Sequence, residues 1–456
     1  MKKNKNIRYV CFLLCVLFFL QSGCTENAVS DNSDSYSTSF ENKNDELTLY
    51  CGAEMKELLM PSVQTFRNKF PEVKVNLIEF GDVNDPQTEI TFKQTLQNDL
   101  AAGKGPDVIV WTDSTFQDIN KTVRSGIFED LNSYLQNDSD FREEDFVKNV
   151  FDGGLYGDER LFIPLGYDIR FLISTEAAME IGGLQLSKTP SLSQWHNAFL
   201  HFQENKKDSN VKFTDISAAE NEVLFLSYSG VPILDYDTGE ILVRSEAFRL
   251  LMEMNKVQYN QTNETDIKPH PGIQITSIRN QKQFFSSISS INEFFGYYAG
   301  IIDRDTPAYY PFPNLDGEKG VACATYSAAI RKNSQNKDAA YEFMKILLSD
   351  SIQSRKTMYS LGCPVRKESL VYMVNNEIIP VGYFQGDDNG VIWQTVPEEE
   401  VEQIIADLLS VEYSKNNIPA LHKFILDAML PYFKGDKSYE TCLDELENKL
   451  GLYIYE

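Results

Sequence analysis

Histidine and tryptophan are scarce in this chain of 456 residues, which contains four histidines and three tryptophans. His196 and His201 are five residues apart, whereas two imidazoles share one face of a helix when they are four apart. His270 and His422 stand alone. No Gly-x-Ser-x-Gly, phosphate-loop or Gly-x-Gly-x-x-Gly motif stands at a strand-to-helix turn. The sequence therefore predicts no metal and no other cofactor.

Closely spaced cysteines are also missing. The chain has seven cysteines, and no two of them form the Cys-x-x-Cys pattern of zinc and redox sites. Cys51, Cys323, Cys363 and Cys442 lie in the body of the chain, and nothing in the sequence selects a pair among them. Buried free thiols are the favoured expectation, and a disulfide in an extracellular setting stays open.

Positively charged residues are fewer than negatively charged ones. Forty-two lysines and arginines face 67 aspartates and glutamates, which gives a net charge of −25. A surface of this sign is repelled by nucleic acid and by anionic lipid. We therefore expect no nucleic-acid partner.

Long apolar runs are missing as well, apart from one at the beginning. Residues 10–20 are all apolar, and Lys2, Lys3, Lys5 and Arg8 precede them. The run is shorter than the about 20 residues that a membrane-spanning helix needs. A basic start followed by a short apolar run is typical of an export signal.

A cysteine stands at the end of this signal. Cys24 follows Ser22 and Gly23, and the stretch "LQSGC" resembles the lipobox of bacterial lipoproteins. This favours lipidation of Cys24 over an ordinary cleaved leader, and it makes residues 1–23 a lipoprotein signal peptide. Residues 24–45 are rich in Ser, Asn and Asp and can bury little apolar surface, so we expect a disordered tether. The expected location is the extracellular face of the cell membrane, with a lipid anchor.

Strands and helices alternate at the beginning of the body. Leu59, Val63 and Phe66 recur at helical spacing between two candidate strands, "LTLYCG" and "VKVNLIEF". A second helical pattern ends near Gly103, and "PDVIVW" is a short apolar strand. This order predicts an α/β domain with a parallel sheet that is covered on both faces.

Longer helical patterns appear in the later part of the chain. "TPSLSQWHNAFLHFQ", "KDAAYEFMKILLSD" and the acidic stretch 398–450 are expected to form helices. "VPILDYDTGEILV" is expected to form a hairpin that turns at Asp-Thr-Gly. Its "DYDTGE" resembles part of a calcium loop, but Gly239 stands where an oxygen ligand is needed, so we expect no metal there.

Several segments resemble the extracellular solute-binding proteins of ATP-binding-cassette importers, in the family-1 group that includes sugar-binding lipoproteins. The segments are "LQNDLAAGKGPDVIV", "GIFEDLNSYL", "LFIPLGYD", "TPSLSQW", "NKDAAYEFMKILLSDSIQSR" with "GCPVRKESL", and the C-terminal "YFKGDKSYETCLDELENKLGLYIYE". Together they cover nearly the whole mature chain in the order of the family.

The resemblance implies a type II periplasmic-binding-protein-like fold, α/β in class, with two discontinuous lobes and crossing hinge strands. The expected lobes are 46–162 with 327–362, and 163–326 with 363–456. The expected crossings are Ile163–Leu165, Ala322–Tyr326 and Gly362–Val365.

The resemblance also implies a function without catalysis. We expect a monomer that closes its lobes on a small ligand and delivers it to ABC permease subunits. An oligosaccharide is the favoured ligand class, and peptides, polyamines and other solutes stay open. Two alternatives stay open. One is an extracellular glycan-cleaving enzyme, because carboxylates are abundant; the other is a ligand-sensing lipoprotein without an importer.

The site is expected beyond the carboxyl ends of the strands, where open α/β sheets bind ligands. Aromatic faces can cover the apolar face of a pyranose, and carboxylates accept hydrogen bonds from its hydroxyls. Trp111 is the strongest candidate, and its replacement by alanine is expected to weaken binding in a folded protein. The ligand-binding candidates are Glu54, Trp111, Asp113, Tyr167, Asp168, Tyr297, Tyr326 and Trp393.

Overall fold

The computed structural model describes residues 46–52, 55–80, 86–205, 211–214, 225–259, 278, 280, 282–288, 290–302, 304–359, 362–384 and 391–455. The chain divides into two units, 1–41 and 42–456, and every described residue belongs to the second unit. The predicted signal peptide, Cys24, the tether and Glu54 lie outside the described residues.

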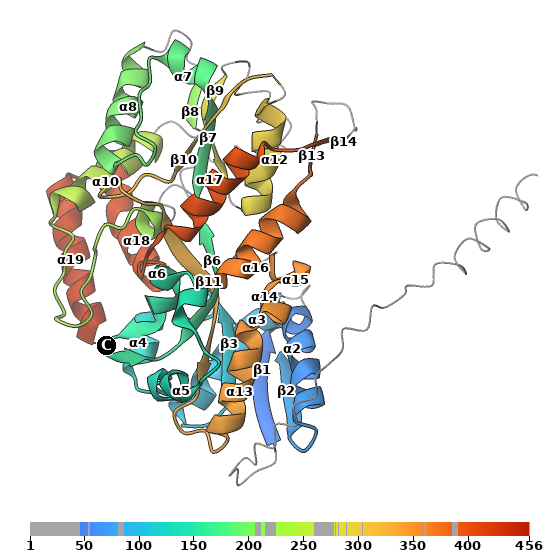
Figure 1. The fold of residues 1–456 in the computed structure, drawn as a ribbon. Coiled ribbons are helices and arrows are strands. Elements are labelled where there is room, and N and C mark those ends of the chain that lie inside the picture. Colours follow the sequence, from blue (N-terminus) through green and yellow to red (C-terminus); the bar gives the residue numbers. More distant parts are fainter. Residues whose placement is uncertain are drawn as a thin grey trace, which may run out of the picture. The chain divides into compact units, whose positions relative to one another are not determined.

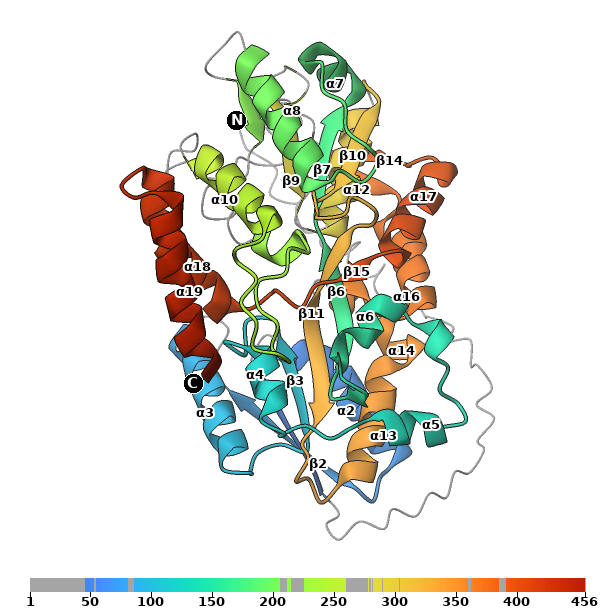
Figure 2. The ribbon, with the colours of Figure 1, turned by 90° about the vertical axis from the view of Figure 1, so that its left-hand side faces the viewer.

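The helices and strands are shown in Figures 1 and 2. The strands are β1 (Glu46–Gly52), β2 (Lys74–Phe80), β3 (Val108–Thr112), β4 (Leu155–Tyr156), β5 (Glu159–Arg160), β6 (Ile163–Ile169), β7 (Phe171–Thr175), β8 (Lys212–Thr214), β9 (Gln283–Ile288), β10 (Pro307–Pro311), β11 (Val321–Ile330), β12 (Cys363–Pro364), β13 (Val381–Phe384), β14 (Val391–Gln394) and β15 (Glu412–Tyr413). The longer helices are α2 (Lys56–Lys69), α3 (Pro86–Ala101), α8 (Leu192–Asn205), α10 (Glu246–Tyr259), α12 (Ile291–Ile302), α13 (Lys337–Leu348), α17 (Glu398–Leu409), α18 (Pro419–Lys434) and α19 (Tyr439–Tyr455). The shorter helices are α4 (Ile119–Arg124), α5 (Asn132–Asn137), α6 (Lys148–Phe151), α7 (Glu176–Gly182), α14 (Asp350–Gln353), α15 (Lys356–Tyr359) and α16 (Lys367–Tyr372), with the single turns η2 (Glu143–Asp145), η3 (Asp152–Gly154) and η4 (Met373–Ile378).

The larger sheet within the described residues has the order β12-β6-β11-β3-β1-β2, and β15 pairs with β11 beside this path. β1 is parallel to both β2 and β3, as the alternation of strands and helices predicts. β11 is antiparallel to β3 and to β6, and β6 is antiparallel to β12. The parallel sheet that is predicted from the first three strands is therefore confirmed, and the strands that join it from later in the chain are mostly antiparallel to their neighbours. The sheet is mixed because β11 enters it after a long excursion, from the opposite end.

Helices α2 and α3 cover this sheet. Leu59, Val63 and Phe66 of α2 are buried, and the ring of Phe66 lies 5.9 Å from that of Phe343 on α13. These contacts confirm the helices that the spacing predicts. Apolar side chains of α3 join a cluster that we call the first core. It contains Phe92, Leu96, Leu100, Ile109, Trp111, Phe116, Val123, Phe128, Leu161, Phe162 and Ala329.

The second sheet has the order β10-β7-β9-β8. Helices α8, α10, α18 and α19 contribute side chains to a separate apolar cluster, which we call the second core. Trp195, Phe199 and Phe202 of α8 lie in it, which confirms the predicted helix face. Two separate cores, each with its own sheet, are what the predicted two-lobe fold requires. We call the parts around them the first and the second lobe.

The three predicted lobe crossings fall on β6, on β11 and around β12. These strands lie side by side, because β6 pairs with both of the others. Figure 2 shows β6 and β11 running from the region of β3 towards that of β7 and β10. The exact lobe boundaries remain a prediction.

Two further segments bear on the site. Leu234 and Ile241 form an antiparallel bridge, and Gly239 has a φ of +74°, so the predicted hairpin is present. The carboxylate of Asp235 accepts hydrogen bonds from backbone N–H groups of the turn itself. The expected helices of the acidic stretch are α17, α18 and α19, and β15 lies between the first two of them, where the backbone of residues 412–413 pairs with β11.

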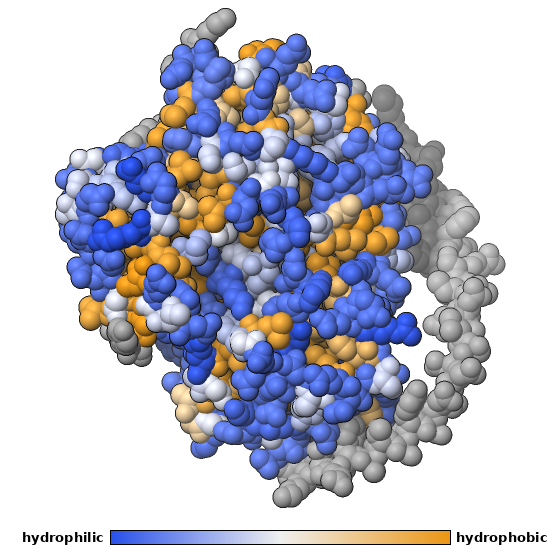
Figure 3. All heavy atoms as spheres, turned by 60° about the vertical axis from the view of Figure 1, so that its left-hand side comes forward, coloured by the Kyte–Doolittle hydropathy of each residue, from blue (hydrophilic) through white to orange (hydrophobic). Residues whose placement is uncertain are grey.

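The four cysteines of the body are all free and buried, as the sequence favours. No described helix is both long and apolar enough to cross a membrane, and the described residues contain no group of His, Cys, Asp and Glu that could hold a metal ion. The face in Figure 3 is largely hydrophilic, with several separate groups of apolar residues.

Candidate functional site

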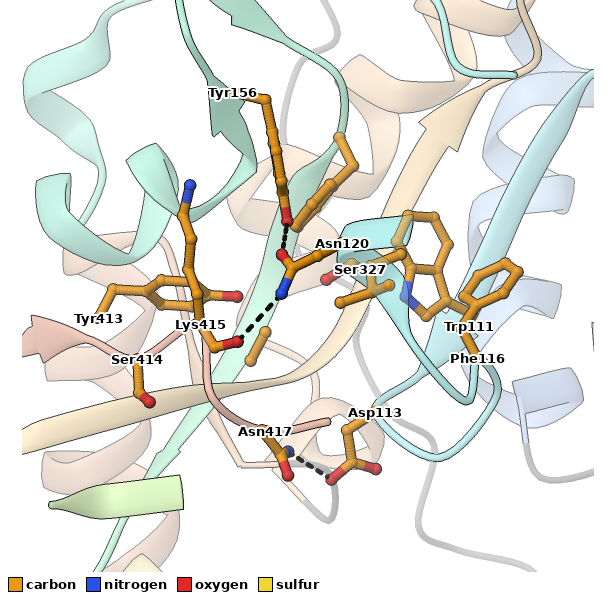
Figure 4. Close-up of a pocket in the computed structure, with 13 residues that line it drawn as sticks. Trp111, Asp113, Phe116, Asn120, Tyr156, Ser327, Tyr413, Ser414, Lys415 and Asn417 are labelled. Atoms are coloured by element: carbon orange, nitrogen blue, oxygen red, sulfur yellow. Dashed lines mark hydrogen bonds between the residues drawn. The ribbon is translucent and has the colours of Figure 1, made fainter. Parts of the chain in front are cut away.

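A cavity lies where the carboxyl end of β3 meets the loop between β15 and α18 (Figure 4). Its lining includes Trp111 and Asp113 at the end of β3, and Lys415 and Asn417 in the loop. Side chains of the first lobe therefore face a loop that leads into the second core. The position agrees with the rule that α/β sheets bind ligands beyond the carboxyl ends of their strands.

One wall of the cavity is aromatic. The ring of Trp111 stacks on Phe128 at a centroid distance of 5.5 Å. Phe116 and Phe162 meet it edge-on at 5.4 and 5.6 Å. Trp111 is only 4% exposed, although Figure 4 shows its indole nitrogen on the side of Ser327, another lining residue. The tryptophan that the sequence selects thus borders the cavity and is also part of the first core.

A carboxylate and an amide connect the two sides of the cavity. Asn417 donates a hydrogen bond from Nδ2 to Asp113 Oδ2 over 3.2 Å, and its Oδ1 lies 3.4 Å from the hydroxyl of Ser227. The surrounding protein desolvates Asp113 and raises the pKa of its carboxyl, while the hydrogen bond from Asn417 opposes this rise. Asp113 can accept hydrogen bonds from a ligand at this position.

A second chain of hydrogen bonds runs along the other side of the cavity. Tyr156 donates to Oδ1 of Asn120 over 2.5 Å, and Nδ2 of Asn120 lies 3.4 Å from the carbonyl oxygen of Lys415. The ammonium group of Lys415 donates to the carbonyl of Leu155 over 2.6 Å and lies 4.2 Å from the centroid of the Tyr156 ring. Burial lowers the pKa of Lys415. These contacts fix both the ammonium group of Lys415 and the side-chain amide of Asn120 in place.

Asp168 lies near the cavity on β6, but it is not part of the lining. Its Oδ2 is 3.4 Å from Nε of Arg170 and 3.5 Å from the hydroxyl of Tyr228. Burial raises the pKa of Asp168 to about 6, and the charge of Arg170 opposes this rise. The structure thus brings Asp113 and Trp111 to the cavity, whereas Asp168 does not line it.

The three predicted site tyrosines do not line the cavity. Tyr167 is fully buried and donates its hydroxyl proton to the carbonyl of Leu408 over 2.8 Å. Tyr326 is buried against Gly166, where an added Cβ would come within 2.1 Å of its ring. Tyr297 lies inside α12 with 1% of its surface exposed. Successive side chains on a strand point to opposite faces of the sheet, so strand-end position alone does not reveal which face Tyr167 and Tyr326 take.

Trp393 is another predicted site residue that lies outside the cavity lining. It lies on β14, which pairs only with β13 in a separate two-stranded sheet of the described residues, and it is 70% exposed. It does not line the cavity. Its exposure makes it a useful control for the buried Trp111.

Sequence reasoning missed seven polar residues that line the cavity. They are Asn120, Tyr156, Ser327, Tyr413, Ser414, Lys415 and Asn417. A signal existed for the last two, because "SKNNIP" is a polar stretch with a proline inside a region that otherwise reads as helix. No local pattern marks Asn120 or Tyr156, since they come to the cavity only through tertiary packing.

The cavity combines an aromatic wall with hydrogen-bond donors and acceptors, among them one carboxylate and one ammonium group. This combination suits a polar solute with apolar faces. Its volume is about 40 Å³. Typical ligand pockets are about 300 Å³ or larger. A solute larger than a few atoms can be held here only after the two sides have moved apart.

Comparisons with known proteins agree with this architecture. The sequence model of the family described as "Bacterial extracellular solute-binding protein" matches residues 52–354. The fold is similar to that of the sugar-binding protein MalE from Xanthomonas citri, with a TM-score of 0.65 and 17% identity over 90% of this chain and 97% of that chain. No curated protein matches the sequence.

Two other solved structures have the same fold. One is an ABC substrate-binding protein from Listeria monocytogenes in complex with cycloalternan, with a TM-score of 0.55 and 15% identity over 90% of this chain and 99% of that chain. The other is the GacH receptor of Streptomyces glaucescens, also solved with acarbose, with a TM-score of 0.53 and 16% identity over 90% and 98%.

Proposed function

Because the chain belongs to the bacterial extracellular solute-binding proteins, we propose that it captures an oligosaccharide between its lobes and delivers it to an ATP-binding-cassette importer. The observation that carries the proposal is the cavity at the end of β3, where an aromatic wall lies beside a carboxylate and amides. Aromatic rings cover the C–H faces of sugars, and carboxylates and amides bind their hydroxyls. Among proteins of similar fold, several are described as sugar-binding or were solved with sugars.

The proposed mechanism is lobe closure. A ligand that touches Asp113 on one side and the loop with Lys415 and Asn417 on the other gains contacts in the closed state that it lacks in the open one. It shifts the equilibrium between the two states by that difference in affinity. The protein itself performs no chemistry on the solute in this scheme.

The test is titration calorimetry of the purified protein with linear malto-oligosaccharides, cycloalternan and acarbose. Short peptides and polyamines serve as comparison ligands. Saturable binding of at least one sugar is expected, with the sugar recovered unchanged afterwards. Binding of a peptide or polyamine alone would overturn the proposed ligand class, and release of shorter sugars would indicate a glycan-cleaving enzyme instead.

Asp113→Ala is expected to weaken binding of a sugar that the wild type binds by about tenfold, the scale of one lost hydrogen bond to a charged acceptor. Calorimetry on both proteins measures the change. Asp140→Ala is the matched control, because Asp140 is exposed on the same lobe and does not line the cavity. Equal affinities of the wild type and the Asp113 variant would remove this carboxylate from the site.

We also propose that the mature protein is held at the membrane through a lipid on Cys24. The basic start, the short apolar run and the Ser-Gly-Cys sequence support this. A single acyl chain binds membranes only marginally, so firm retention needs more than one. Mass spectrometry of the mature N-terminus from cells is expected to find an acylated Cys24, and an unmodified protein with another first residue would contradict the proposal.

A further inference from the structure

Helix α4 of the first lobe begins at a buried carboxylate. Asp118 is 7% exposed, and its Oδ1 accepts a hydrogen bond from the backbone N–H of Lys121 over 3.1 Å. This bond caps the first turn of α4. The helix packs on the first core through Val123 and Ile119. Asp118 therefore belongs to the first lobe.

The other carboxylate oxygen of Asp118 is held by the second lobe. Tyr236, in the hairpin that packs on the second core, donates its hydroxyl proton to Oδ2 over 2.7 Å. Tyr453, near the end of α19, donates to the same oxygen. The ring of Tyr453 lies 4.9 Å from that of Phe424, which also packs on the second core. Two segments far apart in the sequence thus meet at one carboxylate of the opposite lobe.

Two basic residues of α4 extend this contact. The ammonium group of Lys121 lies 3.6 Å from the centroid of the Tyr453 ring and donates to the carbonyl of the same residue. The guanidinium group of Arg124 pairs with Asp237, beside Tyr236, over 2.8 Å. Figures 1 and 2 both show the C-terminal end of α19 next to α4. We call this set of residues the α4 latch: Asp118, Lys121, Arg124, Tyr236, Asp237 and Tyr453.

The α4 latch borders the cavity. Ile119 and Asn120, the first two residues of α4, line it. The cavity has a volume of about 40 Å³ while the latch contacts are formed. Moving the two sides apart by the size of a sugar ring pulls α4 away from the hairpin and from α19. A buried carboxylate that loses its hydrogen bonds is costly, so these contacts resist the movement.

We propose that the α4 latch is an internal lock, which keeps the cavity too small for solute and must release Tyr236 and Tyr453 from Asp118 before solute binds. The inference rests on the proposed function only for the nature of the solute. In thermodynamic terms, molecules with the latch formed cannot bind solute, so the apparent affinity is the intrinsic affinity multiplied by the fraction of molecules in which the latch is open.

The test uses the double variant Tyr236→Phe/Tyr453→Phe, which removes both hydroxyls and leaves the cap bond of Asp118 to Lys121 in place. We expect a larger radius of gyration of the ligand-free protein by small-angle scattering. We also expect about five- to tenfold tighter binding of a sugar that the wild type binds. Tyr439→Phe is the matched control, because Tyr439 starts the same helix and packs on the second core. It is expected to behave as the wild type.

An unchanged radius of gyration, or weaker sugar binding by the double variant, would overturn the latch. If no sugar binds to either protein, the proposed function fails while scattering still decides the latch. Asp237→Asn, at an exposed position, provides a second variant if the double variant does not fold. It breaks only the ion pair with Arg124, and a smaller expansion in the same direction is expected; no expansion would count against the latch.

Discussion

Replacing Trp111 by alanine is expected to lower the free energy of unfolding by about 3–5 kcal/mol, the cost of removing a large buried aromatic side chain. The ring is 4% exposed, stacks on Phe128 and meets Phe116 and Phe162 edge-on. Its removal would leave a void in the middle of the first core. Urea unfolding followed by circular dichroism measures the change.

Trp393→Ala is the matched control for this prediction. Trp393 is 70% exposed, so the loss of its ring is expected to change the free energy of unfolding by less than about 0.5 kcal/mol. From the sequence alone, Trp111 was expected to act mainly on the ligand. A Trp111→Ala protein that is as stable as the wild type and binds sugar poorly would restore that role and contradict the packing argument.

Acidification from pH 6.5 to about 4 is expected to remove up to about 3 kcal/mol of stability through His422. The side chain is 5% exposed, and its Nε2 lies 2.7 Å from the carbonyl oxygen of Asn416. Burial lowers the pKa of His422 to about 4, and the bond to Asn416 opposes this shift only in part. Below pH 6.5 the unfolded chain therefore binds a proton that the folded chain does not. The contribution of His422 to the stability is therefore complete above pH 6.5 and is lost as the pH falls towards 4.

The protonation of Asp168 changes the stability in the opposite direction, over an overlapping range of pH. Burial raises the pKa of Asp168 to about 6, so the folded chain binds a proton that the unfolded chain releases between its ordinary pKa of 3.8 and about 6. This contribution is full below pH 3.8 and is lost as the pH rises through 6. The two groups partly cancel in the wild type, and single variants separate them.

The measurement is the free energy of unfolding at pH 7 and pH 4.5 for three variants. His422→Gln is expected to lose less stability on acidification than the wild type, and Asp168→Asn to lose more. His201→Gln, at an exposed position, is expected to follow the wild type. If the free energies of unfolding of the His422 and Asp168 variants depend on pH as that of the wild type does, burial does not shift the pKa values of these two groups.

The apolar patterns of the chain predicted the elements that pack through one face. Phe66 of α2 and Phe199 of α8 recur at helical spacing, and both are buried where that spacing puts them. The direction of β11 could not be predicted from periodicity, because strand direction depends on which distant strand it pairs with. The existence of β15 could not be predicted either, because its two residues lie between helical patterns and form a strand only by pairing with β11.

The candidate site was predicted in part, for a related reason. Position at the end of β3 brought Trp111 and Asp113 to the cavity. The same argument applied to β6 selected Tyr167, whose side chain instead enters the core and bonds to Leu408. Lys415 reaches the cavity only because β15 attaches to β11, a pairing between segments about ninety residues apart.

The side-by-side arrangement of β6, β11 and β12 also bears on how the molecule withstands damage. We predict that the backbone passes between the lobes along each of these neighbouring strands, which hydrogen bonds join through β6. A single peptide bond cut in any one of them leaves the lobes covalently connected through the other two. With three such passages, an extracellular protease has to cut all of them before the two lobes can separate.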